Sequence, residues 1–337
     1  MRVLAIETSC DETAAAVVDG RTVVSGVVAS QADLHAPYGG VVPEVAARHH
    51  LGTVNAVVER ALGQAGIGLR DVDAVAVTQR PGLIGALLVG VATAKALAYG
   101  AGLPLIMVDH LHGHICAAWL DPVALDPPFV SLVASGGHTR LDLVRHMADP
   151  EPLGQTIDDA AGEAIDKGAR LLGLGYPGGP ALERLAREGD RTAHRFPVGL
   201  AGRGRRDFSF AGVKTALLYA VRERPDAPTD AERADLAASY QEAVLRPLAD
   251  RLVEAAVDHG VPAVALGGGV AANGRLRELV SARAAEHDLR VAVPEMALCT
   301  DNAAMIGAAA QFAPPIAWPG YLGVDAMPTA PPGGIAA

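Results

Sequence analysis

The chain is poor in aromatic side chains, in cysteine and in positive charge, and each shortage excludes something. Aromatic residues make up only 4% of the 337 residues, so Ala, Val, Leu and Gly must fill the core, as where closely packed helices cover a sheet. The net charge of −10 excludes broad nonspecific nucleic-acid binding, although not a local basic patch. There is no CxxC pair and no even disulfide framework, so we expect free thiols in a reducing compartment at Cys10, Cys116 and Cys299.

The chain also lacks a long uninterrupted apolar run. The longest apolar stretch, residues 83–97, contains glycines and a lysine and falls short of a membrane-spanning helix. The opening residues MRVLAIETSCDET contain no long apolar core of a signal peptide, and the first acidic residue arrives at Glu7. We therefore expect a soluble, cytoplasmic protein with no membrane partner.

Half of the residues are hydrophobic and a fifth are charged, which is typical of a folded globular protein. A chain of this length usually needs more than one core, so two lobes are expected. Strand, hairpin, glycine turn and helix occur in the first half and again in the second. The expected strands are residues 3–6, 14–18, 22–28, 72–77, 105–108, 129–134, 139–144, 263–266 and 290–293. The expected helices are residues 50–63, 83–99, 159–172, 233–259, 275–287 and 302–312, with one more from residue 109 to about 120.

The repeated order predicts an α/β protein of two lobes of like topology around a central cleft, with ligands at the strand ends. The Pro- and Asp-rich residues 121–128 favour a boundary, so the lobes are expected at 1–127 and 128–313, with the final helix able to pack back on the first lobe. Residues 173–215, rich in Gly and Arg, indicate an irregular insertion, and the Pro-rich tail 314–337 is expected to be loosely ordered.

Two histidines four residues apart follow a predicted strand and open a helix. Residues at this spacing share a helical face, so His110 and His114 can bind one ion while His112 points away. The spacing alone fits a metal site and a pair of core or solvated histidines equally well. Asp301 offers a carboxylate at another strand-to-helix junction, which favours the metal site. Two histidines and a carboxylate with open positions suit Fe²⁺ and would also accept Zn²⁺.

Familiar phosphate and protease motifs are missing: there is no GK[ST], no GxGxxG and no HExxH. Two glycine turns at strand ends, residues 135–137 and 267–269, nevertheless let the backbone approach a phosphate, because glycine has no side chain to keep it away. Asp159, Glu163 and Asp166 share a helical face, where carboxylates can accept hydrogen bonds from ribose hydroxyls or can simply be solvated beside Lys167.

Acidic and hydroxyl residues also gather at the end of the first strand, in residues 7–13. Such a cluster can bind phosphate or a metal-bound water, or it can form an ordinary polar turn. Asp11 and Glu12 lie in it and are candidate proton acceptors on position alone.

Basic residues interleave with three phenylalanines in residues 191–214. This mixture suits a nucleic-acid backbone with a stacked base, although a solvated loop explains the pattern equally well. The candidate contacts are Arg203, Arg205, Arg206 and Lys214.

Taken together, the motifs make the sequence similar to the TsaD/Kae/Qri family, formerly called O-sialoglycoprotein endopeptidases. The resemblance runs from residue 3 to about residue 313. The motifs are VLAIETSCDET (3–13), GGVVPEVAARHH (39–50), RPGLIGALLVG (80–90), DHLHGH (109–114), ASGGHT (134–139), IDDAAGEAIDK (157–167), YPGGP (176–180), DFSFAGVKTA (207–216), GGGVAANGRL (267–276) and CTDNAAMI (299–306).

The resemblance implies an actin-like (ASKHA) ATPase fold and a transfer reaction on tRNA. The family moves a threonylcarbamoyl group from threonylcarbamoyl-AMP to N6 of the adenosine at position 37, just 3′ of the anticodon, in tRNAs that read codons beginning with A. Bacterial members resemble this chain in lacking a fused kinase, and they work with the partner proteins TsaB and TsaE.

The resemblance also implies roles for particular residues. By motif, His110, His114 and Asp301 correspond to the family's metal ligands, usually of iron. The adenylate-binding positions correspond to Val133, Ala134, Ser135, Gly136, Gly137, Asp166, Gly179 and Asn273. The basic insertion lies where tRNA contact is plausible, but no motif assigns it.

Two positions depart from the family pattern: Arg80 stands where Gly is usual, and His112 stands where Glu is common. Neither departure removes a metal ligand. A small-molecule kinase of the same superfamily, a metalloprotease and a non-catalytic scaffold are the alternatives. A kinase usually binds Mg²⁺ through carboxylates, a protease of the HExxH type would need that motif, and a scaffold would not need the three metal ligands together.

Overall fold

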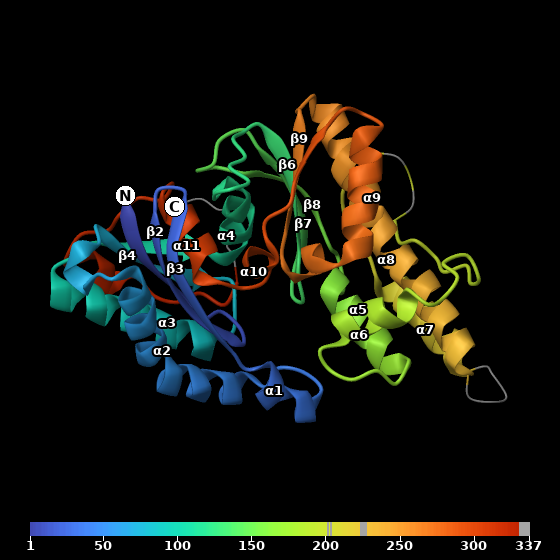
Figure 1. Cartoon of the computed structure of the whole chain (residues 1–337), viewed down its shortest axis with the longest axis horizontal. Coiled ribbons are helices and arrows are strands. Elements are labelled where there is room, and N and C mark those ends of the chain that lie inside the picture. Colours follow the sequence, from blue (N-terminus) through green and yellow to red (C-terminus); the bar gives the residue numbers. More distant parts are fainter. Residues whose placement is uncertain (201, 203, 223–227, 330–337) are drawn as a thin grey trace. The chain divides into compact units, whose positions relative to one another are not determined.

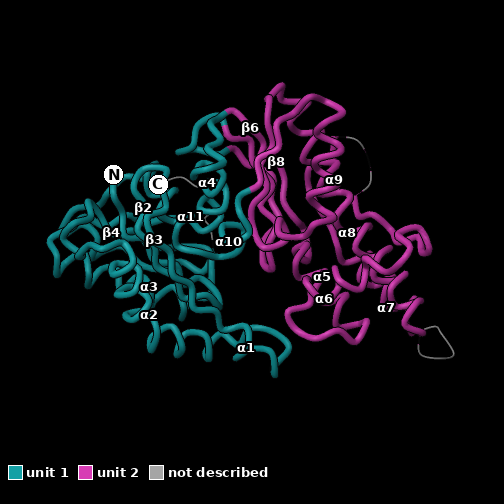
Figure 2. The backbone as a smooth tube through the Cα atoms, viewed as in Figure 1, with its two compact units in different colours: residues 1–127, 145–150, 294–337 teal, residues 128–144, 151–293 magenta. Residues whose placement is uncertain are grey.

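The computed structural model describes residues 1–200, 202, 204–222 and 228–329. The chain forms two compact units, which Figure 2 shows in different colours. Unit 1 comprises residues 1–127, residues 145–150 and the chain from residue 294 onward, and unit 2 comprises residues 128–144 and 151–293. Residues 145–150 and 294–313 thus lie in unit 1. The sequence predicts them in the second lobe, apart from a final helix that can pack back on the first.

The helices and strands alternate along both units. The strands are β1 (Arg2–Glu7), β2 (Glu12–Asp19), β3 (Thr22–Ser30), β4 (Ala74–Arg80), β5 (Leu105–Asp109), β6 (Phe129–Ala134), β7 (Thr139–Val144), β8 (Glu151–Gln155), β9 (Ala263–Gly267) and β10 (Arg290–Ala292). The helices are α1 (Ala32–His35), α2 (Pro43–Ala65), α3 (Ile84–Ala101), α4 (His110–Cys116), α5 (Ala161–Leu171), α6 (Gly178–Ala186), α7 (Ala211–Arg222), α8 (Asp230–His259), α9 (Gly274–Ala285), α10 (Met296–Cys299) and α11 (Ala303–Ala310).

Each unit is built on a five-stranded mixed sheet, and the two sheets have the same topology (Figure 1). The order is β3-β2-β1-β4-β5 in unit 1 and β8-β7-β6-β9-β10 in unit 2. In both sheets the first three strands pair antiparallel, and the last two add parallel to the first strand. The like topology predicted from the repeated order of elements is therefore confirmed.

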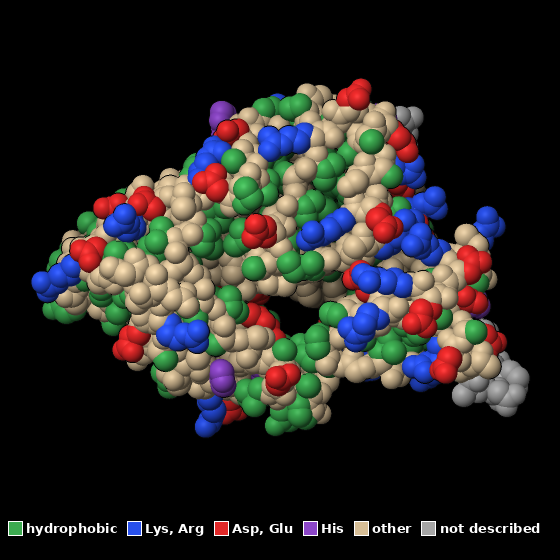
Figure 3. Space-filling model, viewed as in Figure 1, with side chains coloured by type: hydrophobic (Ala, Val, Ile, Leu, Met, Phe, Trp, Pro, Cys, Tyr) green, Lys and Arg blue, Asp and Glu red, His purple; other side chains and the backbone are tan. Residues whose placement is uncertain are grey.

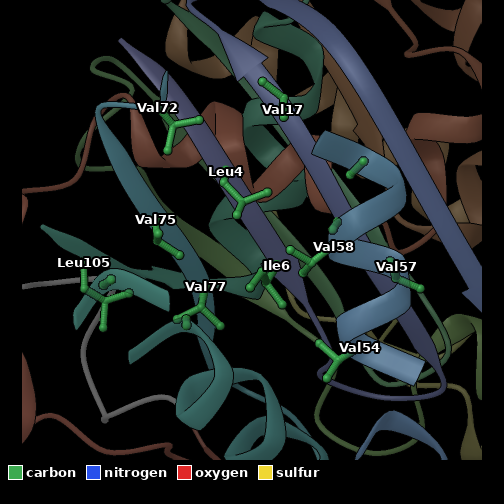
Figure 4. Close-up of a cluster of buried hydrophobic side chains, with 14 of the residues drawn as sticks. Leu4, Ile6, Val17, Val54, Val57, Val58, Val72, Val75, Val77 and Leu105 are labelled. Atoms are coloured by element: carbon green, nitrogen blue, oxygen red, sulfur yellow. The ribbon is translucent and has the colours of Figure 1, made fainter. Parts of the chain in front are cut away.

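Alternate residues of the strands in unit 1 face two different helix layers, as the period of a strand requires. Leu4 and Ile6 of β1 pack with Val54 and Val58 of α2 in one apolar cluster (Figure 4). On the other face, α11 contacts β1 and β2 so closely that a Cβ on Gly307 would lie 2.5 Å from Val18. Small side chains thus allow the helix to lie close to the sheet, where other proteins fill the space with aromatic side chains.

The longest helix of unit 2, α8, has clear local signals at both ends. Thr229 accepts a hydrogen bond from the Glu232 amide, and Glu232 bonds back to Thr229, which forms a capping box. Gly260 ends the helix at φ +63°, a conformation that glycine adopts without steric cost. Between these ends α8 contacts β6, β9, α6 and α9, so it is the helix on which the rest of unit 2 assembles.

Residues 173–215 are not an irregular insertion throughout, because they contain α6 and the start of α7. The sequence hides α6 because it opens with two glycines and Pro180, all poor helix formers. Leu182 and Ala186 are buried, so tertiary packing stabilises α6 where propensity does not. The strand β8 was also missed, since EPLGQ has no apolar alternation and is held by its pairing with β7.

The tail is ordered further than its Pro content predicts. Ile316 exchanges two backbone hydrogen bonds with Leu105, of 2.8 and 3.0 Å, and Tyr321 is buried. Residues 314–329 therefore pack on unit 1, while the rest of the predicted loose tail lies outside the described residues.

Among the described residues, only α3 is long and apolar enough to pass a composition test for a membrane span. Its residues Leu87, Val91, Ala94 and Ala98 are buried, and the helix contacts β4 and α2, as the core helix of a folded unit does.

Candidate metal centre and nucleotide-binding residues

The helix α4 begins at the carboxyl end of β5 in unit 1. In open α/β sheets, ligands bind at this edge of the parallel strands. Asp109 is its N-cap, and one carboxylate oxygen accepts hydrogen bonds from the amides of Leu111 and His112. The cap fixes the first turn of the helix, so that His110 and His114, one turn apart, point to the same side.

Three potential ligand atoms meet beside α4. The Oδ1 atom of Asp301 lies 3.1 Å from His114 Nε2 and 3.5 Å from His110 Nε2. Ligand atoms of the three residues all lie within 4.8 Å of one another. Two ligands that each lie about 2.1 Å from one ion are separated by roughly 3.0–3.4 Å at octahedral to tetrahedral angles. The separations of Asp301 from the two imidazoles lie in or close to this range, and the chemistry of the three groups suits one divalent cation.

A second group of polar atoms orients the ring of His110. Its Nδ1 atom lies 3.2 Å from Glu7 Oε2 and 3.2 Å from Ser9 Oγ. Glu7 is fully buried and also accepts hydrogen bonds from the Thr78 hydroxyl and the Ser9 amide. A carboxylate behind a ligating histidine fixes the tautomer that leaves Nε2 free for a metal. His114 has no such support among the described residues, because its buried Nδ1 makes no hydrogen bond there.

Burial and charge act in opposite directions on these groups. Burial lowers the pKa of His110, but the carboxylates of Asp301 and Glu7 outweigh it and raise the pKa to about 9. Burial raises the pKa of Glu7, yet the charge and hydrogen bond of His110 bring it below its usual value. Burial dominates at His114 and lowers its pKa. The carboxylates of Asp301 and Glu7 thus favour positive charge at His110, between them, as a divalent cation at this centre would also supply.

The candidate proton acceptors lie at the start of β2: Asp11 directly precedes the strand, Glu12 is its first residue, and both are partly exposed. Burial, followed by the charge of Asp11, raises the pKa of Glu12 to about 9. Glu12 Oε1 also accepts a hydrogen bond of 3.0 Å from Ser30. A carboxyl with this pKa keeps its proton at neutral pH.

The glycine turn of unit 2, residues 135–137, follows the end of β6 and contacts the start of α5. Ser135 closes the turn by donating its amide to His138 O, and its carbonyl accepts the Gly162 amide at 3.1 Å. A Cβ on Gly162 would lie 2.6 Å from Ser135 O, so only glycine allows this contact. Gly136 and Gly137 are exposed, with open space beside both. The backbone at these two glycines therefore leaves room for a phosphate.

The other adenylate candidates surround this turn. Asp166 of α5 accepts the Gly179 amide at 3.1 Å, which joins α5 to the start of α6. Gly268, at φ +83°, passes so close to the end of β6 that a Cβ would lie 2.4 Å from Ala134 O. Asn273 caps α9 through its Oδ1 atom and donates to Gln241 Oε1 at 3.0 Å. Its side chain is therefore occupied by structural contacts.

Comparison with known proteins identifies the family. A model of the TsaD family, described as tRNA N6-adenosine threonylcarbamoyltransferase, matches residues 22–308. The chain belongs to the TsaD family. A relative from Cyanothece sp. with that family's name is 54% identical over 313 residues, which cover 91% of this chain and 90% of the relative. One from Anaeromyxobacter dehalogenans is 55% identical over 316 residues, 93% of this chain and 94% of the relative.

Solved structures establish the fold of this TsaD-family chain. Full-length HypF in its phosphate- and nucleotide-bound form matches with a TM-score of 0.61 at 14% identity, over 92% of this chain and 54% of that chain. The (R)-2-hydroxyglutaryl-CoA dehydratase component A of Acidaminococcus fermentans matches with a TM-score of 0.54 at 14% identity, over 93% and 97%. The predicted actin-like (ASKHA) fold is confirmed.

The two departures from the TsaD pattern lie beside the metal helix and line one cavity of about 510 Å³ with Gln79 and Asp149. Arg80 donates from Nε to Asp109, the cap of α4, at 3.2 Å, and both side chains are buried. His112 donates from Nε2 to Met147 O at 2.6 Å, so it points away from the ligand pair, as its helical position predicts.

The predicted tRNA contacts of the insertion differ in their surroundings. Lys214 forms an ion pair with Asp159, which also pairs with Lys167. Arg206 forms ion pairs with Glu254 and Asp258 of α8. Arg205 is exposed, and Arg203 lies outside the described residues.

Two of the three phenylalanines of the insertion offer no stacking surface, whereas Phe196 is partly exposed and its ring centroid lies 6.0 Å from that of Tyr240. Phe208 and Phe210 are buried and lie parallel to each other, with ring centroids 6.2 Å apart. Their place in the core of unit 2 follows from the pairing of this segment with Thr156 and Gln155.

Sequence reasoning missed the role of Glu7 behind His110. The available signal was an acidic residue that ends an otherwise apolar strand, VLAIE, because a carboxylate in such a position needs a buried partner.

Proposed function

We propose that this chain forms t6A in tRNA by moving a threonylcarbamoyl group from threonylcarbamoyl-AMP to N6 of adenosine 37, in tRNAs that read codons beginning with A. The observation that carries the proposal is the convergence of His110, His114 and Asp301 in a chain that matches the TsaD family over most of its length. The carbamoyl donor, the tRNA position and the partners come from the family resemblance.

The reaction is an acyl transfer from a mixed anhydride. The N6 nitrogen of adenosine attacks the carbamoyl carbon, the bond from that carbon to the phosphate oxygen breaks, and a proton leaves N6. The products are t6A and AMP. Because an exocyclic adenine nitrogen is a poor nucleophile, holding the two substrates in the reacting geometry supplies much of the rate.

The metal of the centre is proposed to be Fe²⁺, with Zn²⁺ as the alternative. Two imidazoles and one carboxylate leave open positions, which suits either ion. When bound, such an ion supplies Lewis-acid polarisation of a phosphoryl or carbonyl oxygen. In this chain Asp109 and Glu7 hold the ligand helix and the His110 ring in place for it. Metal analysis of protein purified without chelator distinguishes the two ions.

Of the two candidate proton acceptors, we propose Asp11. Glu12 keeps its own proton at neutral pH, because its pKa is raised to about 9. A group that is already protonated cannot take the proton that leaves N6. Asp11 lies directly before Glu12, between β1 and β2, and is partly exposed, so a substrate can reach it.

The adenylate is proposed to bind unit 2 at Val133, Ala134, Ser135, Gly136, Gly137, Asp166, Gly179 and Asn273. The exposed backbone of Gly136 and Gly137 leaves room for the phosphate. The carboxylate of Asp166, which accepts the Gly179 amide, is proposed to accept a hydrogen bond from a ribose hydroxyl as well. The buried contacts of Asn273 support a role in shaping this pocket through the cap of α9.

Replacing Asp166 with Ala is expected to weaken AMP binding by about 10- to 100-fold, since a hydrogen bond to a charged group contributes about 1.5–3 kcal/mol. Titration calorimetry of AMP measures the effect. The matched control is Glu163→Gln on the same helix. Within the described part of the chain Glu163 pairs with Lys167 alone, so this change should leave AMP affinity unchanged. Equal AMP affinity in Asp166→Ala and the unaltered protein would contradict the assignment.

TsaB and TsaE are proposed as partner proteins, and the cytoplasm as the compartment, because the substrates are tRNA and a labile adenylate. Both proposals rest on the resemblance of the chain to bacterial members of the family.

One assay tests the proposed activity. The protein is incubated with TsaB, TsaE, unmodified tRNA and threonylcarbamoyl-AMP labelled in the threonine, and adenosine from the digested tRNA is analysed. Label on adenosine is expected. Label only in free threonine would contradict transfer, and phosphorylation of a small molecule or cleavage of a peptide would favour a kinase or a metalloprotease.

A further inference from the structure

We propose that three exposed arginines of unit 2, Arg191, Arg195 and Arg205, form a row that binds the phosphate backbone of the tRNA. The proposal rests on the proposed function and deepens it, because it assigns the contact surface of the substrate. It also differs from the pattern expected from the sequence, which placed Arg206 and Lys214 among the contacts.

The three arginines belong to a segment that precedes α8 in the sequence and lies alongside it. We call this segment (residues 190–200 and 204–207) the strap. At its start, the Asp190 amide donates to Asp235 Oδ1 at 2.7 Å, and Ser239 Oγ donates to Asp190 O at 3.1 Å. The His194 amide donates in turn to Ser239 Oγ at 3.1 Å. These contacts fix the first part of the strap to the first turns of α8.

The middle and end of the strap are held by Arg251 of α8. This arginine is buried, and it donates to the carbonyls of Gly199 and Leu200 at 3.0 and 2.8 Å and to that of Asp207. Its guanidinium also lies 5.0 Å from the centre of the Phe208 ring. One arginine thus satisfies three backbone carbonyls that have no partner in a sheet or helix.

The arginines of the strap fall into two classes. Arg206 is mostly buried and pairs with Glu254 and Asp258 further along α8, so it anchors the strap. Arg191, Arg195 and Arg205 are exposed, and the described residues show no ion pair for any of them. An unpaired exposed guanidinium keeps its charge and its donors for an external anion.

The contacts between the strap and α8 run from Asp235 to Asp258, so the exposed arginines are distributed along much of the helix. From Asp235 to Asp258, α8 rises by roughly 35 Å at about 1.5 Å per residue. This length corresponds to on the order of ten nucleotides of a stacked strand. Residues 191–206 contain five arginines and no acidic residue. Because the protein has a net charge of −10, most of its surface does not attract RNA. An extended row of basic residues without acidic neighbours is therefore the surface that suits an RNA backbone.

Two arginines of α9 are less suited to this role. On α9, Arg275 pairs with Glu242 and Glu278, and Arg283 pairs with Asp250 and Glu286. Figure 3 shows Lys and Arg side chains interspersed with Asp and Glu on the face in view. Paired charges of this kind release few counterions on binding RNA, so they contribute little to affinity.

The test measures binding of an unmodified tRNA transcript as a function of salt, with and without TsaB and TsaE. The triple variant Arg191→Gln, Arg195→Gln, Arg205→Gln is expected to lower tRNA affinity at least tenfold. The slope of log affinity against log salt should fall by about two to three, at roughly 0.7–0.9 per phosphate contact. The three matching Arg→Lys substitutions should keep most of the slope, because they keep the charge.

A matched control removes the same charge elsewhere. Arg70, Arg184 and Arg222 are exposed and lie off the strap, so their replacement by Gln should leave the slope unchanged. AMP affinity should be the same in all variants, since none of these side chains lies at the glycine turn.

Four outcomes can be told apart. A lower slope in the strap variant alone supports the proposal. An equal loss in strap and control variants means that only net charge matters, and this overturns it. Unchanged tRNA affinity with weaker binding of TsaB or TsaE assigns the row to an acidic protein surface and also overturns it. If the unaltered protein neither binds tRNA nor transfers the group with partners present, the proposed function itself fails.

Discussion

Protein in which His114 is replaced by Ala is expected to lose its bound metal and to transfer threonylcarbamoyl at least about a hundredfold more slowly. His114 Nε2 lies 3.1 Å from Asp301 Oδ1, so its loss leaves one imidazole and one carboxylate for the ion. Substitutions of groups that merely orient a ligand cost about 10- to 100-fold in metal affinity or activity, and removal of a ligand should cost more. Metal content per chain and the rate of label transfer to tRNA measure the two losses.

The matched control is His112→Gln on the same helix. His112 is buried but bonds to Met147 O and not to the metal ligands, and a glutamine amide can make the same donation. This variant should keep one metal per chain and its transfer rate. If His114→Ala retains a full complement of metal and normal transfer, His114 is a core histidine and the proposed centre is wrong.

His114 gives a cleaner test than His110. The ring of His110 also contacts Glu7, a carboxylate that is 0% exposed. Its removal would leave Glu7 buried without its cationic partner, and the cost to folding would obscure the loss of metal. His114 makes no such second contact among the described residues.

The features that the sequence predicted best are those set by local spacing. The i, i+4 spacing of His110 and His114 places both side chains on one face of α4 whatever surrounds them. The strands β6 and β7 begin and end at the predicted residues, because apolar runs bounded by a Pro-rich segment and a glycine turn leave few alternatives. The repeated order of elements predicted the like topology of the two sheets for the same reason.

The features that were missed depend on contacts between distant segments. Glu7 lies 103 residues before His110, and no local pattern joins them. Arg206 and Lys214 look like free cations in the sequence, but their partners Glu254 and Asp159 come from α8 and from the residues before α5. The helix α6 has poor local propensity and forms because Leu182 and Ala186 are buried against neighbouring helices. The roles of the adenylate and tRNA contacts stay predictions.

A buried ion pair in β7, the strand that follows the glycine turn of unit 2, is expected to contribute strongly to the stability of that unit. Arg140 and Asp142 lie two residues apart on β7 and thus on one face of the sheet. Arg140 donates from Nε to Asp142 Oδ2 at 2.8 Å, and its Nη2 lies 2.7 Å from Oδ1 in the same ion pair. Asp142 is 0% exposed and Arg140 is 8% exposed, so water cannot solvate either charge if the other is removed.

Arg140→Leu is expected to destabilise the β6–β7 hairpin by about 3–5 kcal/mol, because it leaves a buried carboxylate without its cation. Hydrogen exchange measures the effect: amides of β6 and β7 should open more readily by that amount, while those of β1 and β4 in unit 1 should not change. Replacing both residues by Leu should recover most of the loss, since an apolar pair needs no partner charge. AMP affinity should fall in the single variant and recover in the double one, because the hairpin ends in the turn at Ser135. Equal exchange in Arg140→Leu and the unaltered protein would mean that Asp142 gains another partner or a proton, and that the pair does not hold the turn in place.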